Sequence, residues 1–187
     1  AGTSAVPTYN TSITLNANSL VVGSGKGMPG FITFSPQTAK LEHFGSPAQI
    51  DGSQKRWYLL FDPSSDESAD FQFVMPFTYN ANQTLTCILL WTSTVASNNV
   101  VWNASLMATT AADAADLETD SFDTVNAATT AANATIGRVS TTSITMTNKD
   151  SVAAGDICTL RITRDADNAS DTNTGDAELA GIILEWN

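Results

Sequence analysis

Four aspartates near the C-terminal end of the chain have the spacing that most resembles a metal-binding loop. They are Asp165, Asp167, Asp171 and Asp176, and they lie between two runs of alternating apolar residues. Calcium is bound by oxygen ligands that alternate along a loop. An EF-hand also requires glycine at its sixth position and glutamate at its twelfth, where this loop has Ser170 and Asp176. The spacing excludes an EF-hand and leaves a weaker calcium loop as one interpretation.

The same aspartates have a second interpretation, as turn formers. Short Asp and Asn side chains accept hydrogen bonds from nearby backbone N–H groups and stabilise tight turns. Arg161 and Arg164 immediately precede the loop and offer cations that could pair with its nearer carboxylates. We favour this interpretation and predict no cofactor, with calcium kept as the alternative.

The residue types that support catalysis lack the partners that they need. Glycoside hydrolysis requires two carboxylates placed across a cleft, but most acidic residues here fall in predicted turns or in one acidic segment. The only histidine is His43. Cys87 and Cys158 lie inside apolar runs, and we favour two buried thiols over a disulfide between them. No nucleophile, base and acid can be assembled from this set. We therefore predict no catalytic residue and no enzyme activity.

The composition excludes two classes of partner. The chain has a net charge of −11 and eight basic residues, which argues against nucleic acid as a ligand because phosphate binding needs clustered Lys and Arg. No run of 18 apolar residues occurs, so we predict no membrane span. Charged residues make up 14% of the chain, against about 25% in typical soluble domains. A surface of Thr, Ser, Asn and Ala suits β-structure and close packing against neighbours.

From residue 57 onward, short runs rich in β-branched and aromatic residues alternate with turn sequences. Strands are predicted at 57–61, 71–75, 84–91, 100–108, 140–147, 157–164 and 177–186. We expect the third and fourth of these to form a hairpin, and the last two to form a closing hairpin around the aspartate loop. About eight main strands and no long helical period predict an all-β fold, an antiparallel β-sandwich of jelly-roll type.

Two segments depart from this pattern. Residues 1–56 are predicted to be an irregular N-terminal segment for attachment or packing, with short strands at 12–15, 20–22 and 31–34, ahead of a sandwich domain at 57–187; together they are expected to make one structural unit. Residues 109–136 contain no basic residue. We expect them to form a structured excursion pinned by Phe122, with a helical turn at 111–118, because long connections without structure are uncommon.

The four tryptophans allow two interpretations. Trp57, Trp91, Trp102 and Trp186 lie on predicted strands. Large rings on strands usually fill a sandwich core, whereas a carbohydrate-binding module would expose several of them in one coplanar row. We favour the core.

The stretch from about Phe71 to Trp186 resembles a β-sandwich module that recurs among structural proteins of tailed bacteriophages. The matching residues are Phe71–Pro76, Val100–Trp102, Asp113–Asp123, Asn148–Asp156, Arg161–Asp171 and Gly175–Glu178. The resemblance implies a part of the virion, either a head decoration (cement) protein or a piece of the tail or fibre. The first 56 residues match no family, and we expect attachment to a particular virion to be encoded there.

The resemblance and the composition together predict a function. We expect a non-enzymatic capsid decoration protein on the outer surface of the head, which binds the major capsid protein and associates with itself as a homotrimer, because closed symmetric rings are the usual form of such assemblies. The alternative is a tail- or fibre-associated module that binds a receptor or a glycan.

Overall fold

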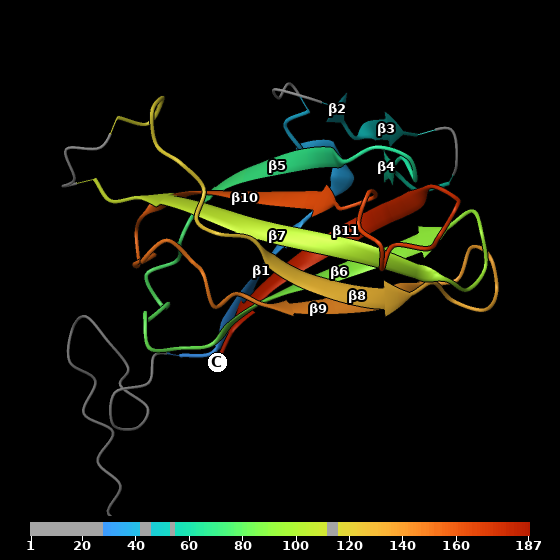
Figure 1. Cartoon of the computed structure of the whole chain (residues 1–187). Helices are drawn as coiled ribbons and strands as arrows, with labels where there is room; N and C mark the ends of the chain where they lie inside the picture. The colour runs from blue at the N-terminus through green and yellow to red at the C-terminus, as the bar shows by residue number, and fades with distance from the viewer. Residues whose placement is uncertain (1–27, 42–45, 53–54, 112–115) are drawn as a thin grey trace, which may run out of the picture.

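The computed structural model describes residues 28–41, 46–52, 55–111 and 116–187, and these form two β-sheets packed face to face (Figure 1). The strands predicted at 12–15 and 20–22, and His43, lie outside the described residues. Among the described residues, no helix has the length and apolar character needed to cross a membrane.

Eight successive strands pair in a nested order. They are β4 (Tyr58–Phe61), β5 (Glu67–Val74), β6 (Leu85–Ser93), β7 (Asn99–Thr109), β8 (Asn126–Ala131), β9 (Ser140–Thr145), β10 (Ile157–Arg164) and β11 (Ala177–Trp186). The first pairs with the last: β4 with β11, β5 with β10, β6 with β9 and β7 with β8, all antiparallel. This wrapped pairing is the jelly-roll topology. The predicted fold class is confirmed.

Strands from before residue 57 extend the same two sheets. β1 (Gly30–Phe34) pairs with β11, and β3 (Gln49–Asp51) pairs with β4. β2 (Ser46–Pro47) pairs with β5 and is parallel to it. A 3-10 turn, η1 (Pro36–Thr38), separates β1 from β2. One sheet therefore has the order β3-β4-β11-β6-β9, with β1 also on β11, and the other has the order β2-β5-β10-β7-β8.

Both predicted hairpins are wrong. β6 and β7 lie in different sheets, and so do β10 and β11. The turn expected between β6 and β7 is present, since Ser97 and Asn98 have left-handed φ angles of 61° and 63°. It carries the chain from one sheet to the other, because both edges of β6 are occupied by β11 and β9. The alternation of residues along a strand determines which side chains face inward, but it does not determine which other strand pairs with it.

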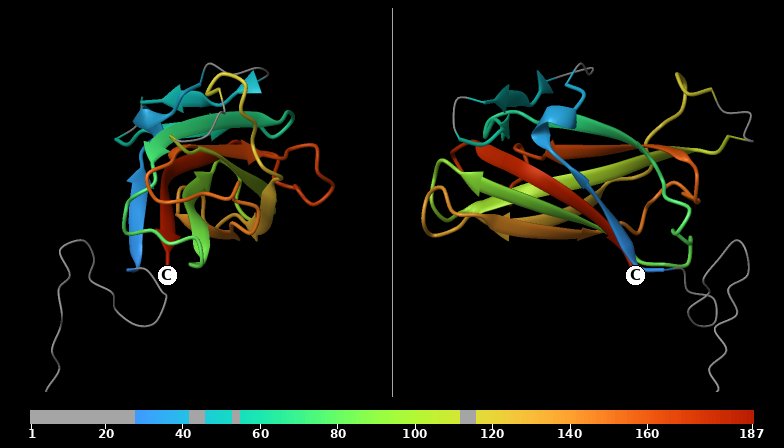
Figure 2. Two further views of the ribbon diagram at one scale, coloured as in Figure 1. Left: turned by 90° about the vertical axis from the view of Figure 1, so that its left-hand side faces the viewer. Right: turned by 180° about the vertical axis from the view of Figure 1, so that it is seen from behind.

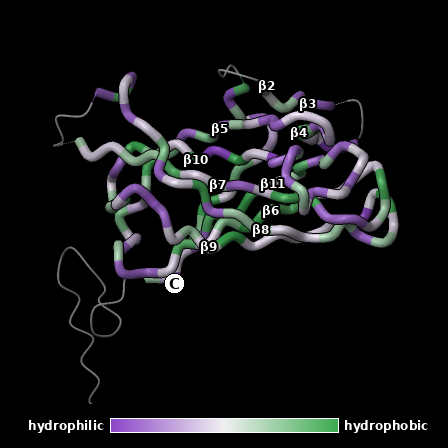
Figure 3. The backbone as a smooth tube through the Cα atoms, viewed as in Figure 1, coloured by the Kyte–Doolittle hydropathy of each residue, from purple (hydrophilic) through white to green (hydrophobic). Residues whose placement is uncertain are grey.

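The core lies between the sheets, and Figure 3 shows that hydrophobic residues are frequent along the strands. Trp91 and Trp102 are fully buried and meet with ring centroids 5.8 Å apart. Trp186 is buried beside Gly30, where an added Cβ would lie 2.4 Å from the indole ring, so only glycine fits. Trp57 is 46% exposed. Core packing is confirmed for three of the four tryptophans, and they form no exposed row.

The segment at 109–136 differs from its prediction. The described residues of the expected helical turn, 111 and 116–118, are not helical, while 112–115 lie outside the described residues. A hydrogen-bonded turn from Asp116 to Asp120 follows, and then β8 forms along the edge of β7. We did not expect β8, because its Asn-Ala-Ala-Thr-Thr-Ala sequence has no large apolar residue to mark a strand.

Candidate functional site

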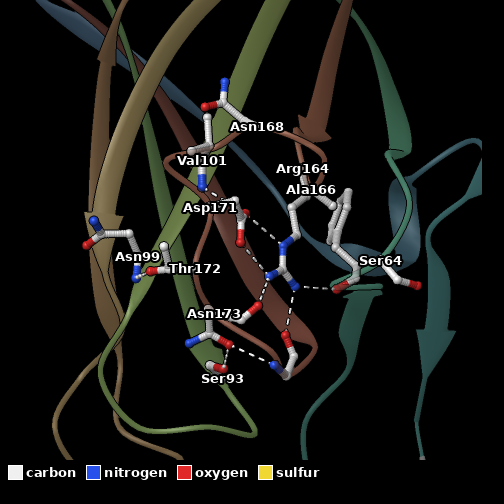
Figure 4. Close-up of polar contacts among 12 residues, drawn as sticks. Ser64, Ser93, Asn99, Val101, Arg164, Ala166, Asn168, Asp171, Thr172 and Asn173 are labelled. Atoms are coloured by element: carbon white, nitrogen blue, oxygen red, sulfur yellow. Dashed lines mark hydrogen bonds and ion pairs between the residues drawn. The ribbon is translucent and has the colours of Figure 1, made fainter.

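The loop between β10 and β11 is organised around one buried arginine. Arg164 projects from the core-facing side of β10 and is fully buried. Its Nη2 donates to Oδ1 of Asp171 at 2.8 Å and its Nε donates to Oδ2 at 3.0 Å. Its remaining hydrogen bonds go to the carbonyls of Phe61, Asn173 and Gly175 (Figure 4). These protein groups account for the position of Asp171, and the predicted pairing of Arg164 with a loop carboxylate is confirmed.

Asn173 ties the same loop to the connection between β6 and β7. Its side chain is buried, and its Oδ1 accepts hydrogen bonds from the Ser93 hydroxyl and the Gly175 N–H. Its amide donates to the carbonyls of Val95 at 3.2 Å and Ser97 at 2.8 Å. All four polar valences of this asparagine are used. The loop therefore closes one end of the sandwich through contacts that the sequence spacing did not reveal.

Two more of the predicted aspartates meet a residue from another loop. Carboxylate oxygens of Asp165, Asp167 and Asp66 lie within 4.8 Å of one another. The charge of Asp66 is the main cause that raises the pKa of Asp167. Asp66 accepts hydrogen bonds from two loop N–H groups, and Asp165 accepts from two asparagine amides. This acidic cluster is the part of the loop that could hold a cation, and calcium binding stays the alternative interpretation.

Asp176 faces a different set of acids. Burial raises the pKa of Glu67, which is 8% exposed, and the charges of Asp62 and Asp176 add to the shift. Burial also raises the pKa of Glu178, and Asp176 adds to that shift as well. The four predicted aspartates thus serve three places, and the structure does not assemble them into one metal site.

At the opposite end of the sandwich, aspartates from the stretches that carry the phage resemblance hold the loops together. Asp150 accepts a hydrogen bond from the N–H of Ala108 at 2.7 Å, and Asp123 accepts one from the N–H of Asp150 at 2.8 Å. Asp156 is buried and accepts from the Thr110 hydroxyl at 2.9 Å. We expected solvated charges in the acidic segment; instead, Asp123 is half-buried and bonded. The feature of the sequence that could have indicated this bonding role is the high Asp and Asn content of the turns.

Asn126 is a further structural residue that the sequence did not single out. Its Oδ1 accepts hydrogen bonds from the N–H and hydroxyl of Thr147 and from the N–H of Asn148, each at 3.0 Å. Its amide donates to the carbonyls of Ala104 and Asn148. The side chain is buried where β8 begins. It fixes the start of β8 against the turn that follows β9.

A groove of about 810 Å³ crosses the outer face of β5, β10 and β7. Its floor is formed by residues that alternate outward on these strands, and its wall is formed by residues of the segment before β8, which passes over the sheet (Figure 1). The lining residues are Lys40, Asp70, Gln72, Met107, Thr109, Leu117, Glu118, Asp120, Phe122, Ile157, Thr159 and Arg161.

An ion pair and an aromatic ring organise the centre of the groove. Arg161 donates to both oxygens of Asp70, from Nε at 2.8 Å and from Nη2 at 2.9 Å. Strand register explains the pair, because Arg161 lies directly opposite Asp70 on β5. The Phe122 ring stacks on the guanidinium at 3.9 Å. Phe122 does pin the excursion as predicted, whereas Arg161 pairs across the sheet and not with the aspartate loop.

The two thiols match their prediction as buried hydrophobic groups. Cys87 and Cys158 are free and fully buried. Burial raises the pKa of each thiol to about 12. A thiol that stays protonated at neutral pH is a poor nucleophile.

Comparison of the sequence with known protein families gives no match, and comparison with curated proteins gives none. Among solved structures, the chain is similar to a family 11 carbohydrate-binding module from Clostridium thermocellum in complex with a β-1,3-1,4-mixed-linked tetrasaccharide (10% identity, TM-score 0.40, 87% of this chain and 92% of that one). It is also similar to a chain of infectious bursal disease virus, Gt strain (8% identity, TM-score 0.40, 94% of this chain).

A third similar structure is described as "CBM4 structure and function" (13% identity, TM-score 0.34, 82% of this chain and 81% of that one). The chain spans about a third of the viral chain's length, since the match covers 35% of it. All three TM-scores are 0.40 or lower, and the fold assignment rests on the strand pairing of this chain itself.

Proposed function

We propose that this chain is a non-enzymatic structural protein of a tailed-bacteriophage virion, and specifically a capsid decoration (cement) protein. One observation carries the proposal: residues in the stretches that resemble phage structural proteins are used to hold the chain's own loops. Arg164 and Asp171 fix one end of the sandwich, and Asp123, Asp150 and Asp156 fix the other. Because these polar residues stabilise loops, they are not available as catalytic groups, which suits a protein that acts through its shape and surfaces.

The outer face of the β3-β4-β11-β6-β9 sheet supports self-association. Ile88 and Ile183 lie side by side on this face, with Leu90 in the next row. Their neighbours on β9 are uncharged, for example Ser143 opposite Ile88. Copies of a chain with a net charge of −11 repel one another, so they approach best through the uncharged patch of Ile88, Leu90 and Ile183, which lies between Glu178 and Glu185 on this face. We assign the contacts of a homotrimer to this face.

The end of the sandwich that holds the C-terminus supports a contact with the major capsid protein. β1 begins there beside the end of β11 (Figure 2). Phe31 on β1 is 68% exposed, and Phe77, just after β5, is 88% exposed. Exposed aromatic rings are typical of protein–protein contacts. β1 belongs to residues 1–56, for which we predict an attachment role.

Two measurements test the proposal. Light scattering after size-exclusion chromatography gives the mass of the full chain in solution, and three copies are expected. Gold-labelled antibody against the chain, applied to virions that carry it, is expected to mark the whole head surface in a regular pattern. A monomer that fails to bind heads stripped of decoration overturns the proposal. Label confined to the tail replaces it with the tail- or fibre-associated alternative.

A further inference from the structure

We propose that the groove over β5, β10 and β7 binds an uncharged oligosaccharide. This adds a binding activity to the structural role proposed above and does not depend on it. The groove's volume of about 810 Å³ falls within the range of sites for small ligands, roughly 300–1,000 Å³. Its lining combines a few polar groups with apolar side chains, which is the composition that such sites share.

The charges of the groove favour a ligand without charge. Both oxygens of Asp70 are bonded to Arg161, so the strongest cation on the floor is already neutralised. Glu118 and Asp120 on the wall repel an anion, and Lys40 repels a cation. A neutral polyhydroxylated molecule meets neither penalty. Its hydroxyls can accept hydrogen bonds from the Arg161 guanidinium and donate hydrogen bonds to the Asp70 carboxylate.

Two further side chains on the floor are available to a ligand. Gln72 and Thr159 lie opposite each other on β5 and β10 and both face the groove. Gln72 is exposed and Thr159 is half-buried. Within the part of the chain that the structure describes, no residue bonds to the Gln72 amide or the Thr159 hydroxyl. Together they offer hydrogen-bond donors and acceptors at neighbouring positions on the floor of the groove.

Apolar side chains line the rest of the groove. Met107 and Ile157 flank Thr159 on the floor, and Leu117, which is 52% exposed, lies on the wall. The C–H faces of a pyranose ring pack on such side chains while its hydroxyls reach the polar groups. Phe122 is held in place by its stack on Arg161, so the wall is fixed before a ligand arrives.

The geometry disfavours an extended peptide as the occupant. The groove lies on the face of a sheet, and β10, at its centre, is paired on both edges with β5 and β7. No backbone groups of β10 remain to bind a peptide as an added strand. Side chains must make all the contacts, as they do with sugars.

Affinity gel electrophoresis of the full chain tests this inference. The gels contain either a neutral polysaccharide (dextran, mannan, xylan or galactomannan) or an acidic one (alginate or polygalacturonate). We expect at least one neutral polymer to retard the chain and acidic polymers to have no effect. No retardation by any neutral polymer, or retardation by acidic polymers alone, overturns the inference.

Variants then locate the binding. The double variant Gln72→Ala, Thr159→Ala is expected to bind at least about tenfold more weakly, since it removes two sites of hydrogen bonding. Gln72→Ala alone is the substitute if the double variant does not fold, because its side chain is exposed. Thr129→Ala is the matched control: this exposed threonine on β8 does not line the groove and is expected to leave binding unchanged. Equal binding by the wild type and the groove variants overturns the assignment.

Discussion

Arg164 and Asp171 form an ion pair whose side chains are 0% and 1% exposed, and this pair joins the last residue of β10 to the loop that crosses to the opposite sheet. The three carbonyls that also accept from Arg164 come from the end of β4 and from the loop itself. Buried charges are tolerated only when paired and hydrogen-bonded. The closure of this end of the sandwich therefore depends on the Arg164 guanidinium together with the contacts of Asn173.

We expect Arg164→Ala to destabilise the fold by about 3–5 kcal/mol, because removing one partner of a buried pair leaves the other charge uncompensated. The measurement is chemical unfolding followed by tryptophan fluorescence. Arg138→Ala, at an exposed loop position, is the control and is expected to change stability by less than about 0.5 kcal/mol. A loss below about 1 kcal/mol for Arg164→Ala would mean that solvent or another group replaces the guanidinium.

Chelation is expected to leave the melting temperature unchanged. Asp66 and Asp165 already accept hydrogen bonds from protein N–H groups, and Asp171 is bound to Arg164. Differential scanning calorimetry with calcium and with a chelator makes the comparison. As a further check, Asp167→Asn removes the repulsion from Asp66 and should raise the melting temperature at low ionic strength. A melting temperature that falls on chelation, with Asp167→Asn abolishing the effect, would establish the calcium loop instead.

Much of the fold could be predicted from the sequence, because the alternation of apolar and polar residues that marks a strand is a local pattern. Alternation in 157–164 marks Cys158, Leu160 and Ile162 as inward residues, and they are buried. Pairing is not local. The nested order joins β4 to β11 across more than a hundred residues. As a result, each of the two strand pairs that looked like hairpins, β6 with β7 and β10 with β11, is divided between the sheets. β8 was missed because small residues carry no period.

The candidate sites were less predictable, because they depend on contacts between loops. Sequence spacing grouped four aspartates that the fold separates, and it did not bring in Asp66, which lies about a hundred residues away in the chain. The groove could not be foreseen either. Its floor depends on the register that places Arg161 opposite Asp70, and its wall on the path of the segment that carries Phe122.

The stability of the fold should fall as the pH rises past the titration of Glu67. Burial raises the pKa of this carboxyl in the folded state, with Asp62 and Asp176 adding to the shift. Between its unfolded value, about 4.3, and its higher folded value, the folded state holds more protons than the unfolded state. Stability contributed by the protonated group is therefore present below about pH 4.3 and lost as the pH rises through the folded pKa.

Glu67→Gln tests this pH dependence, because glutamine keeps an oxygen to accept the hydrogen bond from the N–H of Asp62. Urea unfolding from pH 4 to pH 8 should show the variant gaining stability relative to the wild type as the pH rises. Glu118→Gln, at an exposed position, is the control and should follow the wild type. A constant difference between Glu67→Gln and the wild type across this range would contradict the prediction.

Both cysteines should resist thiol reagents in the folded protein. Cys87 and Cys158 are fully buried, so a reagent cannot reach them in the folded protein. Burial also raises the pKa of each thiol to about 12, so both thiols are protonated at pH 8. Titration with a chromogenic disulfide is expected to label neither thiol in native buffer and both in denaturant. Rapid labelling of one thiol in native buffer would show that its sheet opens locally.

Phe122 anchors the segment that walls the groove, and its loss should release that segment without unfolding the sandwich. The ring stacks on Arg161 at 3.9 Å, and the guanidinium stays held by Asp70 when the ring is removed. Asp123, next in the chain, still bonds to Asp150 and to the carbonyl of Leu106, which confines the change to residues before it. We therefore expect Phe122→Ala to speed amide exchange and proteolysis at 116–121 while exchange in β10 stays slow. Phe122→Tyr keeps the ring and should retain the slow exchange of the wild type. Fast exchange in β10 of Phe122→Ala would instead show that the ring supports the whole sheet.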